Sequence, residues 1–227
     1  MPTPENHLLA ALPRAVLARF VANSEVVQLP LDCVLWKPDE DSSVAYFPLK
    51  GVVSLEAVVN EIPSLQVGMI GREGMAGMHL LLGARSSSLF ACVFLGGNAR
   101  ACQAPDLRHL MQDCQPFRRV MGRYIEFTLA QLSAAAACVR FHHIEQRLAK
   151  WLLMSHDRAD GETIHATHET MAHLLGVRRV GITVAATAMQ NAGYIRYVRG
   201  AISLLDRPGL ERRACSCYAR EISLKNR

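Results

Sequence analysis

The sequence lacks the long apolar runs of a membrane protein. Its best candidate, from Leu132 to Val139, is far shorter than the roughly 18–20 residues that a membrane span needs. The N-terminal stretch also differs from a signal peptide, because Glu5, Arg14 and Arg19 interrupt its apolar residues. We therefore expect a soluble, cytoplasmic protein with no membrane partner.

The seven cysteines lack the even number and the regular spacing of a disulfide framework. The chain has no Cys-x-x-Cys and no paired Cys/His pattern, which argues against a disulfide framework and against structural zinc. Cys215 and Cys217 are expected to point to different faces of a helix. Most of the seven are expected to be buried as small apolar side chains: Cys33, Cys92, Cys102, Cys114, Cys138, Cys215 and Cys217.

The signatures of common enzyme classes are missing as well. The sequence contains no Gly-x-Ser-x-Gly, no P-loop, no His-Glu-x-x-His and no plausible Cys/His nucleophile pair. We therefore expect no catalytic residue and no enzymatic activity. With half of its 227 residues apolar and a fifth charged, the chain can still bury a substantial core, which excludes a disordered protein.

Charge is present but unevenly distributed. The net charge is +5, from 25 Lys/Arg and 20 Asp/Glu. Residues 1–140 hold 12 basic and 12 acidic side chains, whereas residues 141–227 hold 13 and 8. A neutral N-terminal part and a basic C-terminal part indicate that the C-terminal part binds a polyanion such as nucleic acid. By itself, the charge is equally compatible with a merely solubilising surface.

The N-terminal part of the chain changes from a helical pattern in the first twenty residues to the pattern of short strands from residue 26 onward. Leu8, Leu12, Val16 and Phe20 recur at helical spacing and predict helix within the first twenty residues. Between residues 26 and 95, short β-branched or aromatic runs alternate with prolines and glycines. This pattern predicts an antiparallel sandwich or barrel. Glycines at every third position predict a tightly turning segment between strands: Gly68, Gly71, Gly74 and Gly77.

Residues 116–139 predict one helix of about 36 Å with an apolar stripe. The stripe could lie in the core of its own domain or form a two-fold seam between two copies. We favour the seam, because a β-sandwich this small cannot cover so long a stripe. A second amphipathic helix is predicted over 143–157. The stripe consists of Phe117, Val120, Met121, Tyr124, Thr128, Gln131, Leu132 and Ala135.

The most informative segment begins at Thr167, a good N-cap. Counting from His168, a small Ala is fifth, Gly176 is ninth and Ile182 is fifteenth. Two helices that cross closely require the small residue, the tight turn requires the glycine, and the isoleucine fixes the second helix on the first. This spacing is typical of a helix-turn-helix.

Two alternating strands, 194–198 and 201–205, follow the helix-turn-helix and join at Arg199-Gly200, which predicts a wing. Arg178 and Arg179 lie at the start of the second helix. The N-terminus of a helix carries positive partial charge, so two cations there are unfavourable unless an anion binds to them. Solvated arginines at a frayed helix end are the alternative. The candidate DNA-binding residues are Thr167, His168, Arg178, Arg179, Thr183 and Arg199.

The chain resembles the CRP/FNR superfamily of bacterial transcription regulators over nearly its full length. The resemblance implies an α+β fold: an N-terminal antiparallel, jelly-roll-like β-roll sensor (1–115), a dimerisation helix and hinge (116–142), and a C-terminal winged helix-turn-helix domain (143–227). The matching segments are Tyr46-Phe47-Pro48, Gly51 to Leu55, Ile70 to Met75, Glu145 to Leu153, Leu175 to Arg179 and Ile202 to Arg207.

The resemblance also implies partners. A homodimer formed through 116–139 would bind a pseudo-palindromic site on double-stranded DNA, with RNA polymerase and a small-molecule effector as further partners. Val180 and Val184 replace residues that usually read bases, so we expect an operator different from the family's best-known palindrome.

The effector is not identified by the sequence, and neither is a cofactor. In cyclic-nucleotide members, residues equivalent to Glu73 and Arg85-Ser86 hold ribose and phosphate, with Gly71 and Gly74 in the same cassette. Arg85 lies further from Glu73 than that cassette normally allows. We therefore expect no binding of cAMP or cGMP.

A haem- or metal-dependent gas or redox sensor is the alternative. Met78-His79 and Pro2 correspond to the haem-ligating positions of the family's carbon-monoxide sensor, which makes His79 a weak metal candidate. An oxygen sensor with an iron–sulfur cluster is excluded, because such members of the family have an N-terminal cysteine cluster, whereas here Cys33 is the only cysteine near the N-terminus.

Overall fold

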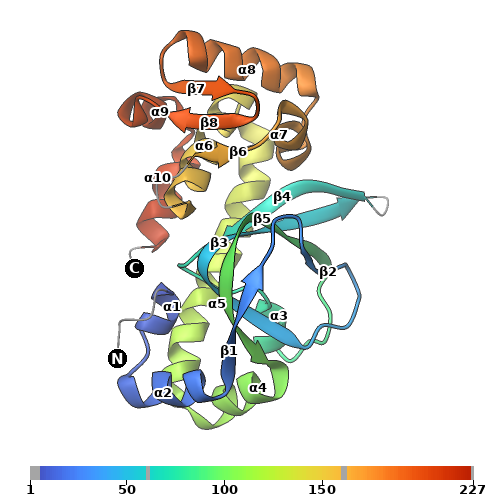
Figure 1. The fold of residues 1–227 in the computed structure, drawn as a ribbon, viewed down its shortest axis with the longest axis vertical. Helices are drawn as coiled ribbons and strands as arrows, with labels where there is room; N and C mark the ends of the chain where they lie inside the picture. Colours follow the sequence, from blue (N-terminus) through green and yellow to red (C-terminus); the bar gives the residue numbers. More distant parts are fainter. Residues whose placement is uncertain (1–5, 60–61, 160–162, 226–227) are drawn as a thin grey trace.

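The computed structural model describes residues 6–59, 62–159 and 163–225. A β-roll and a C-terminal helical unit are joined by one long helix, α5 (Gln115–Phe141), which runs past the side of the sheet (Figure 1). Pro2, one of the two proposed haem-ligating positions, lies outside the described residues. None of the helices in the described part of the chain is long and apolar enough to cross a membrane.

The β-roll is antiparallel, as the sequence predicts. Its strand order is β1-β5-β3-β4, with β2 paired to β5, and β3 aligns with β5 from Val44 opposite Gln103 to Ala57 opposite Leu89. Helices cover one end of the sheet, where Phe20, Phe47 and Phe117 pack together with no exposed surface. The elements are α1 (His7–Ala10), α2 (Arg14–Ala22), β1 (Ser24–Leu29), β2 (Val34–Trp36), β3 (Val44–Val59), β4 (Ile62–Ile70), α3 (Met78–Leu81), β5 (Leu89–Gln103) and α4 (Ala104–Asp113).

Two details of the β-roll differ from the sequence prediction. The N-terminal helix is split, because Pro13 cannot donate a backbone hydrogen bond and instead precedes a second helix, α2. The glycine-rich segment is only partly a turn. Gly68 lies inside β4, whereas Gly71 and Gly74 form the turn after that strand and Gly77 precedes α3.

The apolar stripe of α5 is mostly buried within the β-roll, not left for a second copy. Phe117, Met121 and Tyr124 are buried, and the Tyr124 hydroxyl donates to the Met75 carbonyl at 2.9 Å. The expectation that a sandwich this small could not cover the stripe is therefore wrong for these residues. Helix α5 passes behind the strands of the β-roll in Figure 1, and its buried face supplies part of the β-roll core.

A second apolar row runs along α5 beside the buried stripe. Leu129 is 56% exposed and Val139 is 42% exposed, although both are large apolar side chains. The row repeats at alternating steps of four and three residues, which is heptad spacing. We call it the seam row: Ile125, Leu129, Leu132, Ala136 and Val139.

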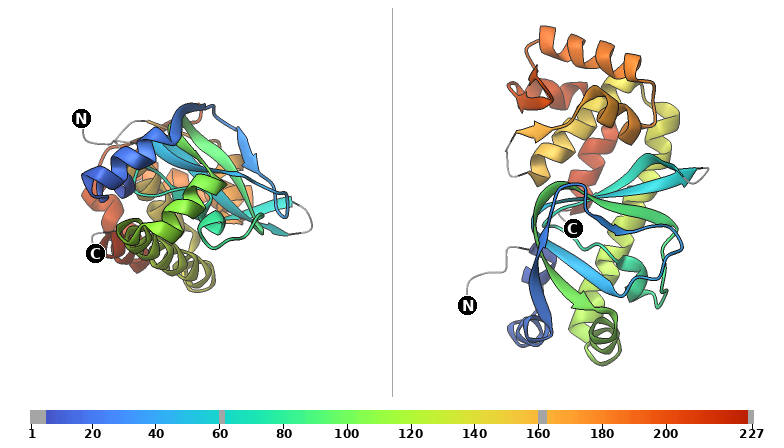
Figure 2. Two further views of the ribbon diagram at one scale, coloured as in Figure 1. Left: turned by 90° about the horizontal axis from the view of Figure 1, so that it is seen from below. Right: turned by 45° about the vertical axis from the view of Figure 1, so that its right-hand side comes forward.

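The C-terminal unit packs helices around a small three-stranded sheet, ordered β6-β8-β7 (Figure 1). The right-hand view of Figure 2 shows α8 at the outer end of this unit, away from the β-roll. Leu148, Leu152 and Ile182 are completely buried in its core. The sequence did not predict β6 or α9, and it expected a helix around Cys215 and Cys217 without the bounds of α10. The elements are α6 (Ile144–Arg158), β6 (Ile164–His165), α7 (His168–Leu175), α8 (Arg179–Asn191), β7 (Ile195–Val198), β8 (Ala201–Leu204), α9 (Arg207–Arg213) and α10 (Ser216–Lys225).

Candidate nucleic-acid interface

Helices α7 and α8 form the predicted helix-turn-helix. The Thr167 hydroxyl accepts from the Thr170 backbone N–H at 3.0 Å and so caps α7. Gly176 ends the helix in the left-handed conformation, with φ 61°. Ala172 and Ile182 are both buried where the two helices cross. The three spacing constraints found in the sequence thus act as predicted.

The start of α8 presents two exposed arginines to solvent. Arg178 is the N-cap residue and makes no capping hydrogen bond with its side chain, and Arg179 begins the helix proper. Both are exposed, and the Nε of Arg179 lies 3.8 Å from a carboxylate oxygen of the exposed Glu169. The helix dipole and the backbone N–H groups add to this positive end, which suits an anion.

His168 connects three elements instead of facing solvent alone. Its Nδ1 and the Thr183 hydroxyl on α8 share a hydrogen bond of 3.0 Å. Its ring stacks on Tyr197 of β7, with centroids 4.6 Å apart. Burial, together with the nearby charge of Arg179, lowers the pKa of His168 below its ordinary value. A neutral His168 therefore fixes α8 and the hairpin relative to α7.

The predicted wing is a tight hairpin beside the start of α7. Strands β7 and β8 pair from Ile195 opposite Leu204 to Val198 opposite Ala201. Arg199 and Gly200 turn the chain with φ values of 50° and 83°, the positive pair that a two-residue hairpin needs. The Gly200 carbonyl accepts from the Ala166 N–H at 2.8 Å, which holds the exposed Arg199 next to Thr167.

The structure thus gathers the six candidate residues on the α7 start, the α8 start and the hairpin turn. Two apolar side chains lie on the same exposed part of α8: Val180 is 67% exposed and Val184 is 62% exposed. The sequence singled them out as departures from the family that could touch a thymine methyl group but could not make the usual hydrogen bonds to bases. They place two apolar side chains beside the arginines at the exposed start of α8.

The five candidate effector residues do not form one polar site. Glu73 is buried and accepts from the Arg158 Nε at 2.7 Å and from the Gly71 N–H at 3.2 Å. Gly74 packs so closely on Tyr124 that an added Cβ would lie 2.5 Å from the Tyr124 hydroxyl oxygen. Arg85 is instead exposed and pairs with Asp41 at 2.9 Å, and Ser86 follows it in the loop before β5.

His79, the candidate metal ligand, lies at the start of α3. Its Nε2 and the Ser42 hydroxyl share a hydrogen bond of 2.7 Å, and its ring meets Trp36 edge to face at 5.3 Å. Burial lowers the pKa of His79. These contacts are those of a neutral histidine that belongs to the packing of the β-roll.

A buried polar network joins the β-roll to the C-terminal unit. The Nη2 of Arg158 donates to Glu221 on α10 at 2.9 Å, while its Nε is bound to Glu73. Gln131 on α5 donates to the same Glu221 oxygen at 2.9 Å, and Lys150 lies 3.9 Å from the other oxygen. Four segments distant in sequence therefore meet around two carboxylates.

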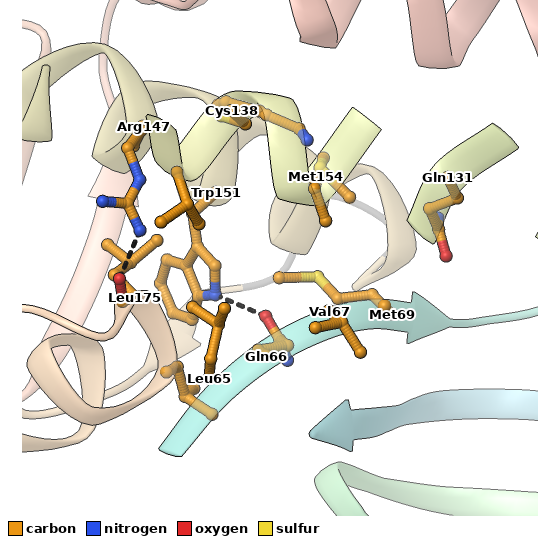
Figure 3. Close-up of a pocket in the computed structure, with 15 residues that line it drawn as sticks. Leu65, Gln66, Val67, Met69, Gln131, Cys138, Arg147, Trp151, Met154 and Leu175 are labelled. Carbon is orange, nitrogen blue, oxygen red and sulfur yellow. Dashed lines mark hydrogen bonds between the residues drawn. The ribbon is translucent and has the colours of Figure 1, made fainter. Parts of the chain in front are cut away.

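A pocket lies next to this network, between β4, α5, α6 and α7 (Figure 3), and Gln131 and Lys150 belong to both. Trp151 projects into it and donates to the Gln66 side chain at 2.8 Å, and Arg147 donates to the Leu175 carbonyl. Met69 and Met154 complete much of the wall. The pocket lies on the contact between the β-roll and the helix-turn-helix.

Cysteines at the end of α5 and at the start of α10 converge, contrary to the sequence prediction. Cys215 was expected on a different helix face from Cys217. That expectation is wrong, because α10 begins at Ser216 and Cys215 precedes it. Both thiols consequently turn toward the end of α5. There they meet Cys138, whose Sγ lies 3.6 Å from that of Cys215, and His142, whose Nδ1 lies 3.7 Å from the Sγ of Cys217.

Comparison with known proteins agrees with this geometry. Residues 146–213 match the Crp-like helix-turn-helix domain. Over 174 residues the chain is 26% identical to the transcriptional regulator SdrP of Thermus thermophilus, an alignment that covers 74% of this chain and 82% of SdrP.

Two solved structures have the same fold. FixK2 of Bradyrhizobium japonicum superposes with a TM-score of 0.72 at 15% identity, covering 85% of this chain and 98% of FixK2. TTHA1359, a CRP/FNR-family transcriptional regulator of Thermus thermophilus, superposes with a TM-score of 0.68 at 23% identity, covering 84% of this chain and 98% of TTHA1359.

Proposed function

Because this chain is a transcriptional regulator of the CRP/FNR family and not an enzyme, we propose that it acts as a homodimer on a pseudo-palindromic operator. In this proposal residues 1–115 are the sensor, 116–142 the dimerisation helix and hinge, and 143–227 the DNA-binding domain. The observation that carries it is the exposed start of α8, with two arginines and two valines beside the hairpin turn.

We assign α8 to the major groove as the recognition helix. Its N-terminal arginines can fork onto a guanine edge or pair with phosphate, and Thr183 lies one turn further on the exposed face. Thr167 and Arg199, held together by the Ala166–Gly200 hydrogen bond, would contact the backbone on either side. His168 would act by positioning α8 and the wing.

The seam row supports a two-fold dimer through 116–139. A heptad row of exposed or half-buried apolar side chains on a helix of 27 residues is suited to packing against a second copy. Dimerisation through parallel α5 helices would present two recognition helices to successive major grooves, about 34 Å apart.

An effector at the β-roll would act through the contacts that hold the two units together. Glu73, one of the predicted effector-binding residues, is bound to Arg158 of α6. A ligand that competes for this carboxylate, or for the neighbouring Gly71 and Gly74, would release α6 and shift the population of DNA-binding conformers. Arg85 and Ser86 would join such a site only after a rearrangement of the loop before β5.

The direct test is DNA binding by arginine variants. An operator selected from random duplexes would be titrated with wild type, Arg178→Ala and Arg179→Ala at a fixed salt concentration. We expect each variant to bind about tenfold or more weakly, corresponding to about 1.4 kcal/mol, and a phosphate contact to reduce the salt slope by about one.

Arg108→Ala is the matched control, because Arg108 is exposed on α4 at the opposite end of the molecule from α8 (Figure 1). It should bind the operator as wild type does. Wild-type affinity in both α8 variants would refute the assignment of the interface.

A further inference from the structure

Four side chains with metal-binding atoms meet at the junction of α5, the hinge and α10. Two come from the end of α5 and its C-cap, and two from the start of α10, 77 residues away between Cys138 and Cys215. Their ligand atoms all lie within 4.8 Å of one another. We call them the Cys/His cluster: Cys138, His142, Cys215 and Cys217.

Two of the six separations within the cluster match the edges of a metal tetrahedron. With Zn–S bonds of about 2.3 Å and Zn–N bonds of about 2.0–2.1 Å, tetrahedral angles place two sulfurs about 3.8 Å apart and a sulfur and a nitrogen about 3.6 Å apart. In the structure the two pairs measure 3.6 Å for Cys138 Sγ to Cys215 Sγ and 3.7 Å for Cys217 Sγ to His142 Nδ1. The remaining pairs lie within 4.8 Å of each other, so the side chains need to close these separations by at most about 1 Å to hold an ion.

Buried positive charge lies beside the cluster. Arg147 and Lys150 of α6 are both buried, and they line the same pocket as Cys138. Three thiolates, a neutral histidine and a divalent ion carry a net charge of −1, which these cations offset.

We propose that the Cys/His cluster binds one Zn²⁺ ion and fastens α10 to the end of α5. Three cysteines and one histidine are a four-ligand set that fills a tetrahedral zinc site and leaves no open position, as in structural sites. Binding releases the three thiol protons to solvent while the His142 ring binds through Nδ1. Zn²⁺ is not oxidised or reduced, so its role here is structural.

The location gives the ion a role in domain coupling. His142 caps α5 and is followed immediately by His143, the N-cap of α6, so it lies in the hinge itself. Helix α10 carries Glu221, which binds Arg158 and Gln131. Metal at the cluster would therefore hold the hinge and the polar network in one arrangement, and its removal would loosen the C-terminal unit from α5.

The test uses the full-length protein expressed with zinc, purified under reducing conditions and dialysed. Elemental analysis should give about one zinc per chain. Cobalt exchanged into the site should produce thiolate-to-cobalt charge-transfer bands and the strong visible bands of tetrahedral Co²⁺. A strong chelator should lower the melting temperature of the zinc-loaded protein. The cobalt spectrum and the chelator response need no substitution, so they test the site even if a variant fails to fold.

Substitutions then assign the ligands. Cys217→Ala and His142→Ala should lose most of the zinc and the tetrahedral cobalt bands. Cys102→Ala removes an equally buried thiol in the β-roll, and His109→Ala removes an exposed imidazole on α4. Both controls should retain one zinc per chain.

Three outcomes would overturn the site: wild-type protein with well under about a tenth of a zinc per chain, zinc retained by both cluster variants, or a Cys138–Cys215 disulfide in freshly isolated protein. None of these measurements involves DNA. The zinc site and the proposed operator binding can therefore fail independently.

Discussion

Arg158 and Glu73, 85 positions apart, form a buried ion pair with Nε 2.7 Å from Oε1. Each side chain is only 6% exposed. Burial would lower the pKa of Arg158, but the charges of Glu73 and Glu221 outweigh it and raise that pKa. The pair links the turn after β4 to the end of α6, so the β-roll and the C-terminal unit are held together by charge inside the protein.

Replacing Glu73 with Gln should destabilise this contact strongly. The variant leaves Arg158 buried with Glu221 as its remaining carboxylate partner, so we expect a loss of about 3 kcal/mol in the free energy of unfolding. Urea unfolding would measure the loss, and hydrogen exchange should show faster opening of α6. The control is Glu40→Gln, which breaks the exposed ion pair between Lys37 and Glu40 at 3.7 Å. It should lower the free energy of unfolding by less than about 1 kcal/mol. Equal losses in the two variants would contradict the coupling role.

Acidification should destabilise the protein through His79. Burial lowers the pKa of His79 below its ordinary value of 6.5, so the unfolded chain binds a proton more readily than the folded one. This contribution to stability is complete above the unfolded pKa and falls as the pH drops toward the folded pKa. His79→Gln should therefore show a weaker pH dependence of unfolding between about pH 7.5 and about pH 5.5. The exposed His109→Gln control should retain the wild-type slope; an unchanged slope in His79→Gln would refute the assignment.

The exposed valines of α8 predict recognition of thymine methyl groups. Changing a contacted thymine to uracil removes only the methyl group and should weaken wild-type binding by about 0.8 kcal/mol, or about fourfold. A Val180→Ser, Val184→Ser double variant should bind the two duplexes equally. Val26→Ser, at an exposed valine of β1, should keep the wild-type discrimination. If uracil has no effect at any operator thymine, the valines do not read methyl groups.

The seam row predicts the dimer interface. Leu129→Asp places a charge in the centre of the row and should convert a dimer of 25.0 kDa chains to monomer, with operator affinity reduced more than tenfold. Light scattering coupled to gel filtration would measure the mass. Ala137→Asp adds the same charge on another exposed face of α5 and should remain dimeric. If the Leu129→Asp variant remains a dimer, the seam row is not the dimer interface.

The helix-turn-helix could be predicted from the sequence because its determinants are local. Thr167 caps a backbone N–H three residues away, and Gly176 takes a left-handed conformation that most side chains disfavour. Arg199-Gly200 likewise determines its own hairpin turn. Such signals act over a few residues, so their spacing is visible without a structure.

Long-range pairing could not be predicted in the same way. Helix α5 has two adjacent apolar rows, and periodicity does not distinguish the one that meets its own sheet from the one that is left exposed. The boundary of α10 similarly decided the position of Cys215, because a shift of one residue at a helix start changes the direction of a side chain.

The sequence by itself determined the class of protein: the uneven charge, the helix-turn-helix spacing and the hairpin turn are carried by composition and by neighbours along the chain. Only the tertiary structure decided that Glu73 binds Arg158 instead of facing Arg85, and that Cys138 meets Cys215. The physical reason is that a buried ion pair or a ligand cluster depends on which distant segments pack together. That choice is made by the whole core and not by the residues of the pair.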